Sequence, residues 1–165
     1  NSAGCLLGKD YHFQMTRPGI ALYGVHPLET RLPDLQPVFD WQARILQIRQ
    51  AAAGDRVGYG GTFELQRQSR IATIGVGYAD GYRRQLGGKA TVSIGGKTAP
   101  VIGRISMDSI TVDVTDLDQN SLRADHASLI HDAYPIEKMA ADLGTISYEI
   151  MTTLGQRADW RYHGG

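Results

Sequence analysis

One segment, residues 71–84 with the sequence IATIGVGYADGYRR, constrains the fold of this chain most strongly. Its first residues alternate apolar and small side chains up to Val76, which predicts a buried β-strand. Three glycines then surround Tyr78 and Asp80, and glycine lets a backbone turn sharply and approach a neighbour closely. We therefore predict a strand that ends in a glycine-rich turn. Tyr78 would either meet a ligand there or pack beside Tyr82.

The glycine spacing and the composition narrow the possible functions. The glycines run G-x-G-x-x-x-G with no helical pattern after them, which disfavours a nucleotide-binding loop. Basic and acidic residues balance at 17 each among 165 residues, so no net charge attracts nucleic acid or an anionic membrane. The single Cys5 favours a reducing compartment, and neither a transmembrane run nor a signal peptide is visible. We expect a cytoplasmic protein that binds neither nucleic acid nor membranes.

Short alternating segments separated by glycine turns predict a mainly β fold. We expect a long strand at 39–51, a short glycine-rich strand at 57–63, a hairpin with strands 90–94 and 99–102, and a half-buried strand at 110–114. Pro135 and Gly144 bound one short helix, and a second runs from Ser147 to a stop at Gly155. The pattern indicates an antiparallel barrel or sandwich with two short C-terminal helices.

Two segments near the N-terminus carry polar groups. In RPGIALYG, Pro18 makes Arg17 extended and leaves the backbone amides of Gly19 and Ile20 with little steric cover. An arginine followed by two accessible amides suits an anionic or aromatic acceptor, although the residues alone favour a strand start with a surface arginine. Ser2 either caps a short helix or offers its hydroxyl to a ligand.

The string GRISMD precedes the strand predicted at 110–114. At such a position Met107 usually fills a core and Asp108 usually stabilises a turn. The following aspartates resemble half of a calcium loop, but Ser121 and Ala127 replace the glycine and the glutamate that such a loop requires. The histidines show no metal-ligand spacing, so we expect no metal site.

Four strings, NSAG, RPGIALYG, GVGYADGY and GRISMD, resemble in this order motifs of the bacterial alanine racemase family. Those enzymes use pyridoxal 5'-phosphate to interconvert L- and D-alanine and supply D-alanine for peptidoglycan. The likeness implies that residues 11–165 form the family's C-terminal β-barrel-like domain. It also implies that residues 1–10 end an N-terminal α/β barrel, most of which precedes this chain. Since the cofactor-binding lysine lies in that barrel, we expect the fragment alone to be inactive.

The resemblance also implies roles around the cofactor. Arg17 matches an arginine that hydrogen-bonds the pyridine nitrogen, and Ser2 with the Gly19 and Ile20 amides matches phosphate ligands. Many relatives have a tyrosine, in an ISYR-like string, where this chain has Gln156. Gln156 can still donate a hydrogen bond to the phosphate, but the substitution leaves the preference for alanine over serine open.

For catalysis, the resemblance implies that Tyr78 exchanges the α-proton on one face of the substrate while the lysine serves the opposite face. The amide of Met107, with Asp108, matches the region that receives the substrate carboxylate. In this family Tyr78 and Met107 serve the active site of the partner subunit, so a homodimer with shared active sites is implied.

Alternative functions remain open at this point. The same scaffold fits a serine or broad-specificity amino-acid racemase, and a non-catalytic β domain for assembly is a different class of function. A pyridoxal-phosphate decarboxylase fits less well, because decarboxylases with a similar barrel lack the GYADGY string.

Overall fold

The structure is a computed structural model that describes residues 1–27, 35–155 and 157–164. The chain divides into two compact units, residues 1–40 and residues 41–165. This division lies later in the chain than the boundary expected at residue 10. The assignment of residues 1–10 to the end of an N-terminal barrel therefore stays a prediction.

Unit 1 is built from short helical turns, namely α1 (Ser2–Leu6), η1 (Lys9–Tyr11) and η2 (Ile20–Tyr23). The side chain of Asn1 accepts a hydrogen bond from the Gly4 amide at 2.9 Å, so Asn1 rather than Ser2 caps α1. η2 ends at Gly24, which has a φ of 74°. A Cβ atom at Gly24 would lie 1.8 Å from the carbonyl oxygen of Gln36, so this close approach requires glycine.

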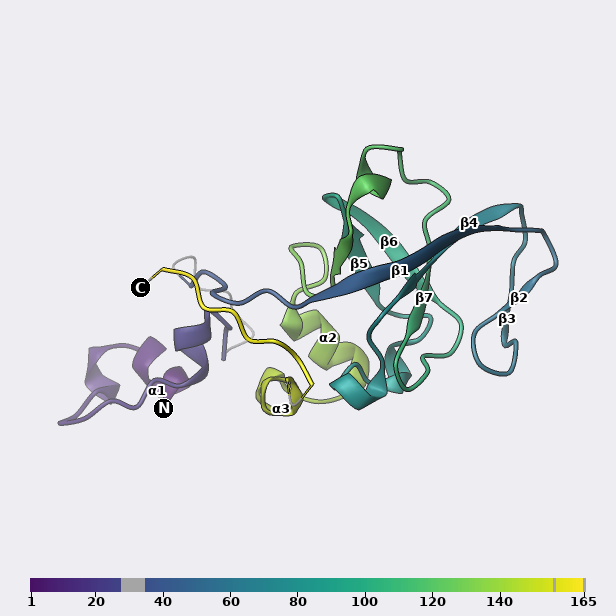
Figure 1. The fold of residues 1–165 in the computed structure, drawn as a ribbon. Helices are drawn as coiled ribbons and strands as arrows, with labels where there is room; N and C mark the ends of the chain where they lie inside the picture. The colour runs from purple at the N-terminus through teal and green to yellow at the C-terminus, as the bar shows by residue number, and fades with distance from the viewer. Residues whose placement is uncertain (28–34, 156, 165) are drawn as a thin grey trace. The chain divides into compact units, whose positions relative to one another are not determined.

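Unit 2 contains a closed antiparallel barrel with the strand order β1-β4-β7-β6-β5-β8 (Figure 1). The strands are β1 (Gln42–Ala51), β4 (Ser69–Ile74), β5 (Thr91–Ile94), β6 (Lys97–Ile102), β7 (Ile110–Asp113) and β8 (His126–Ser128). β1 closes the barrel because Gln42 pairs with Ser128 of β8, whereas Ile48 pairs with Ala72 of β4. The predicted mainly β fold is confirmed, in its barrel form.

The barrel core begins at β4, the strand predicted to be buried. Ile71, Ala72 and Ile74 are each no more than 2% exposed, and β4 pairs with β1 on one side and β7 on the other. Burial of a large aliphatic side chain contributes roughly 1.5–3 kcal/mol. In β7, buried Ile110 and Val112 alternate with half-buried residues, as the sequence pattern predicts. The strand before the Tyr78 turn is therefore held firmly on both sides.

A single strand at residues 57–63 is a wrong prediction. The chain instead forms two short antiparallel strands, β2 (Arg56–Val57) and β3 (Phe63–Glu64). Between them Gly58, Gly60 and Gly61 all have positive φ. These glycines reverse the chain direction rather than extend it, because left-handed backbone cannot continue a strand.

Three local predictions are confirmed in the second half of the chain. β5 and β6 form the expected hairpin around Gly95 and Gly96. The expected helices are α2 (Ile136–Leu143) and α3 (Ser147–Thr153), and left-handed Gly144 ends α2. α2 packs against α3 and against η4 (Arg84–Leu86), at one end of the barrel (Figure 1). Within the described ranges, no helix has the length and apolar character needed to span a membrane.

Candidate active site

Tyr78 is the first residue of a 3-10 turn, η3 (Tyr78–Asp80), that follows β4 as predicted. Its side chain is 44% exposed. The Asp80 Oδ2 atom accepts a hydrogen bond from the Gly77 amide at 2.9 Å, which fixes the backbone just before the tyrosine. Gly81 ends the turn with a φ of 95°. The tyrosine is thus presented outward from a turn whose backbone is held in place.

The Tyr78 turn is fastened to the loop that precedes β7. The amide of Tyr78 donates to the carbonyl oxygen of Ser106 at 3.1 Å, and the amide of Ala79 donates to that of Met107 at 3.0 Å. A Cβ atom on Gly77 would lie 2.3 Å from the Met107 carbonyl oxygen and 2.4 Å from that of Ser106. The structure therefore brings together Tyr78 and Met107, which the sequence analysis assigned to the same site.

A guanidinium from the C-terminal segment joins both motifs. Arg157 Nη1 donates to Asp108 Oδ1 at 2.8 Å, and Arg157 Nε lies 3.4 Å from Asp80 Oδ1. The hydrogen bond to Asp108 and the charge of Asp80 raise the pKa of Arg157. Sequence reasoning gave Arg157 no role, because Asp108 lies 49 residues away and no local spacing links the two.

Met107 and Asp108 have side chains outside the core. Met107 is 52% exposed, so it does not fill the core as a methionine at such a position usually does. The side chain of Asp108 is 60% exposed, and its negative charge is opposed by Arg157. That pairing weakens the repulsion which a bare carboxylate would exert on an approaching anion.

In unit 1 the predicted phosphate ligands also come together. Ser2 Oγ accepts hydrogen bonds from the amides of Gly19 at 2.8 Å and Ala21 at 3.2 Å. The Gly19 amide, a predicted phosphate ligand, thus donates to Ser2 in this structure, and Ile20 is buried at the start of η2. A hydroxyl that accepts two hydrogen bonds still has its own proton to donate. Arg17 is exposed, and Gln156 lies outside the described residues.

Tyr82, at the other end of the turn, differs sharply from Tyr78. It is fully buried, and its ring packs edge-on against Trp41 with centroids 5.7 Å apart. Its hydroxyl has no hydrogen-bond partner in the described part of the chain, and burial raises the pKa of Tyr82. Tyr134 is also buried, but its hydroxyl donates to Asp142 at 2.7 Å. Tyr82 is therefore a core residue, whereas Tyr78 is available for chemistry.

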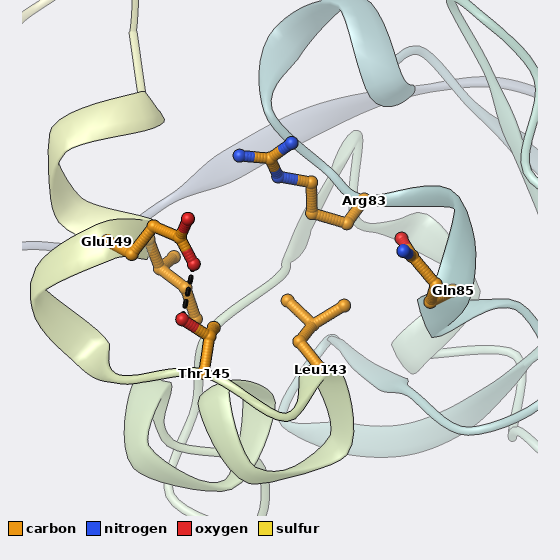
Figure 2. Close-up of a pocket in the computed structure, with 6 residues that line it drawn as sticks. Arg83, Gln85, Leu143, Thr145 and Glu149 are labelled. Carbon is orange, nitrogen blue, oxygen red and sulfur yellow. Dashed lines mark hydrogen bonds between the residues drawn. The ribbon is translucent and has the colours of Figure 1, made fainter.

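A hollow of about 190 Å³ is lined by residues from the η4 region and from the α2–α3 region, namely Arg83, Gln85, Leu143, Thr145, Glu149 and Ile150. In Figure 2 the Thr145 hydroxyl donates to the Glu149 carboxylate on its wall. None of the predicted site residues that the structure describes lines this hollow. The candidate site is therefore the pair of fastened loops, not this cavity.

Comparison with known proteins identifies relatives over nearly the whole chain. The family described as "Alanine racemase, C-terminal domain" matches residues 38–162. The biosynthetic alanine racemase of Agrobacterium fabrum is 44% identical over 98% of this chain and 44% of its own length. The crystal structure of alanine racemase from Bartonella henselae with covalently bound pyridoxal phosphate is 48% identical. Its TM-score is 0.87, and the match covers 95% of this chain and 44% of the Bartonella henselae chain.

A second solved structure agrees with the first. The biosynthetic alanine racemase of Pseudomonas aeruginosa is 35% identical with a TM-score of 0.88, over 99% of this chain and 46% of that chain. This chain thus spans less than half the length of the curated relatives that it matches. The family match, the sequence identity and the closed barrel show that the chain belongs to the alanine racemase family, as its C-terminal domain.

Proposed function

We propose that this chain is the C-terminal part of a pyridoxal-phosphate-dependent alanine racemase, in which Tyr78 transfers a proton to and from the substrate. The family membership supports the reaction class. The observation that carries the proposal is the exposed phenol of Tyr78 on a turn fastened to the Met107 loop by two backbone hydrogen bonds. An exposed side chain on a rigid backbone is what a proton-transfer group requires.

Tyr78 would act on one face of the α-carbon of alanine, and a lysine outside this chain would act on the opposite face. A phenol is a weak base at neutral pH, so the complete enzyme must place cationic or hydrogen-bonding groups around it. We assign the substrate carboxylate to the amide of Met107. Its neighbour Asp108 does not oppose this assignment strongly, because Arg157 counters its charge.

The residues of unit 1 fit the phosphate and the ring of the cofactor. The Ser2 hydroxyl keeps a proton that it can donate to a phosphate oxygen. A Cβ atom at Gly19 would have no described atom within 4 Å, so a phosphate can approach the Gly19 amide, which donates to Ser2 in this structure. Arg17 donates N–H groups but does not give up a proton, so it would contact the ring nitrogen without protonating it. When bound, pyridoxal phosphate supplies the electron sink that acidifies the α-hydrogen of an amino acid.

We further propose a homodimer in which Tyr78 and Met107 of one subunit serve the site of the other. The exposure of both side chains supports this assignment. The product would be D-alanine for peptidoglycan, made in the cytoplasm.

The decisive test is Tyr78→Phe in the complete enzyme that contains this chain. We expect racemisation to fall by about 10²- to 10⁴-fold, the usual contribution of a general acid or base, with cofactor absorbance and dimerisation unchanged. Tyr59→Phe is the matched control, since Tyr59 is an exposed tyrosine on the β2–β3 turn. Equal turnover of the two variants would refute the catalytic role and would favour a domain that serves assembly alone.

Substrate preference needs a separate measurement. We expect the complete enzyme to form D-alanine with a clear preference over D-serine. Comparable kcat/KM values for the two amino acids would replace the proposal with a broad-specificity racemase on the same scaffold.

A further inference from the structure

We propose that Arg157 is a positioning residue that holds Tyr78 in place for proton transfer, by clamping its turn against the loop that carries Met107. The inference rests on the function proposed above, because it concerns the same proton-transfer step. In that step the α C–H bond of alanine breaks, the proton passes to the phenolate oxygen of Tyr78, and the electron pair stays with the substrate. Arg157 acts through the carboxylates of Asp80 and Asp108, which hold the backbone of the two loops, and it does not have to touch the substrate.

The first half of the clamp runs through Asp80. One oxygen of its carboxylate lies 3.4 Å from Arg157 Nε, and the other accepts the amide proton of Gly77 at 2.9 Å. Gly77 is the residue directly before Tyr78. A continuous set of polar contacts therefore leads from the guanidinium to the backbone that aims the phenol.

The second half of the clamp runs through Asp108. Its carboxylate accepts a hydrogen bond from Arg157 Nη1 at 2.8 Å. Asp108 directly follows Met107, whose carbonyl oxygen accepts the amide proton of Ala79 from the Tyr78 turn. Asp80 and Asp108 thus directly follow Ala79 and Met107, the two residues that join the loops by a backbone hydrogen bond. Arg157 adds a second connection between the loops, through side chains.

Arginine suits this position for a geometric reason. Its planar group presents several N–H donors in a fixed fork, so two carboxylates from different loops can bind it at once. A lysine offers one compact charge and would favour one carboxylate over the other. The side chains of Arg157 and Asp80 are 50% and 21% exposed. The pair between Arg67 and Asp116, by contrast, is 55% and 78% exposed, so solvent screens it more strongly.

The test is hydrogen exchange at the α-carbon in D2O, measured separately for L- and D-alanine with the complete holoenzyme. Tyr78→Phe identifies the enantiomer whose α-hydrogen Tyr78 removes, because only that enantiomer should stop exchanging. We expect Arg157→Gln to slow exchange of the same enantiomer by roughly ten- to a hundredfold and that of the other by less than about threefold, as for a displaced catalytic group. A loss of folded enzyme would slow both equally.

Two further variants and one control test the same prediction independently. Asp80→Asn keeps an oxygen for the Gly77 amide but removes the charge that faces Arg157, so it should reproduce the one-sided loss even if Arg157→Gln does not fold. The exchange rate of Arg157→Lys for the affected enantiomer should lie between that of the wild type and that of Arg157→Gln. Arg67→Gln is the matched control, because it removes an exposed arginine from another ion pair, and it should leave both rates unchanged.

The outcomes separate the two proposals. Equal losses for both enantiomers, or no loss, in folded Asp80→Asn overturn the positioning role, and so does the same result in Arg157→Gln where that variant folds. If Tyr78→Phe retains its one-sided effect in that case, the proposed function stands. If Tyr78→Phe itself shows no one-sided effect, the proposed function fails as well.

Discussion

The turn that carries the candidate site has two ends, a Tyr78 end and a Tyr82 end, with opposite surroundings. At the Tyr78 end the side chain is 44% exposed, and backbone hydrogen bonds to the neighbouring loop hold the turn. At the Tyr82 end the side chain is fully buried against Trp41, and its hydroxyl has no partner among the described residues. Two residues of one type on the same turn thus have separate tasks.

The difference shows how an exposed residue can be held precisely in place. Burial of a large aromatic ring supplies several kcal/mol of local stability without using a polar group. The Tyr82 end anchors the turn in the core, so the Tyr78 end can expose its phenol without becoming loose. The stability of the turn and its proposed chemistry therefore lie in different residues, and substitutions can separate them.

The largest expected effect is at the Tyr82 end. We expect Tyr82→Ala to lower the free energy of unfolding by about 3–5 kcal/mol, because it leaves a large cavity in a packed core. Tyr78→Ala should change it by less than about 1 kcal/mol, since the side chain is largely outside the core. Urea unfolding of both variants measures the contrast, and similar losses would show that the two ends are not separable.

The backbone contact between the loops gives an intermediate effect. In Gly77→Ala the new methyl group would lie 2.3 Å from a backbone oxygen. We expect a loss of about 1–3 kcal/mol together with reduced racemisation. Gly75→Ala is the matched control, because the nearest atoms to its methyl group would be those of the Leu46 side chain, at 3.3 Å. Leu46 is exposed and can move, so a loss as large in Gly75→Ala would rule out the loop contact as the cause.

The smallest expected effect at neutral pH is that of Tyr82→Phe. Removing an unpartnered buried hydroxyl should change stability by less than about 1 kcal/mol, and the change can be favourable. Tyr134→Phe is the contrasting variant, because it loses a hydrogen bond to Asp142 and should cost about 1.5 kcal/mol. Urea unfolding at pH 7 distinguishes them, and an equal cost for both would indicate that Tyr82 has a hydrogen-bond partner.

The same variant should also change the response to alkaline pH. Burial raises the pKa of Tyr82 above its ordinary value of 10.0. The folded chain therefore keeps this proton where the unfolded chain loses it, and the free energy of unfolding falls as pH rises above about 10. Tyr82→Phe should reduce that fall by up to about 1.4 kcal/mol per pH unit. Identical slopes from pH 9 to pH 11 would contradict the buried position.

Features with local causes were predictable from the sequence. Gly95 and Gly96 locate the β5–β6 hairpin, and Pro135 and Gly144 bound α2, because each of these residues restricts or frees its own backbone. The alternation at β7 likewise identified its buried face. The neighbourhood of Tyr78 and Met107 was accessible only through the family resemblance, since nothing in the spacing places two segments so far apart side by side.

Features that depend on distant contacts were not predictable in this way. The order of strands around the barrel follows from which distant strands pair, and an alternating pattern does not name its partner. The link from Arg157 to Asp80 and Asp108 has the same character. At residues 57–63 the apolar residues suggested a strand, but the left-handed glycines between β2 and β3 decided the local path.

The double pairing of β1 has a consequence for synthesis on the ribosome. β1 is the first barrel strand to emerge, yet residues 42–44 pair with residues 126–128 of β8, the last barrel strand. Until that late segment leaves the exit tunnel, the early strand keeps unpaired backbone groups that neighbouring nascent chains can contact. The barrel therefore closes only after residues 126–128 have left the tunnel, and slow elongation between β1 and β8 would prolong the interval in which chaperones are needed.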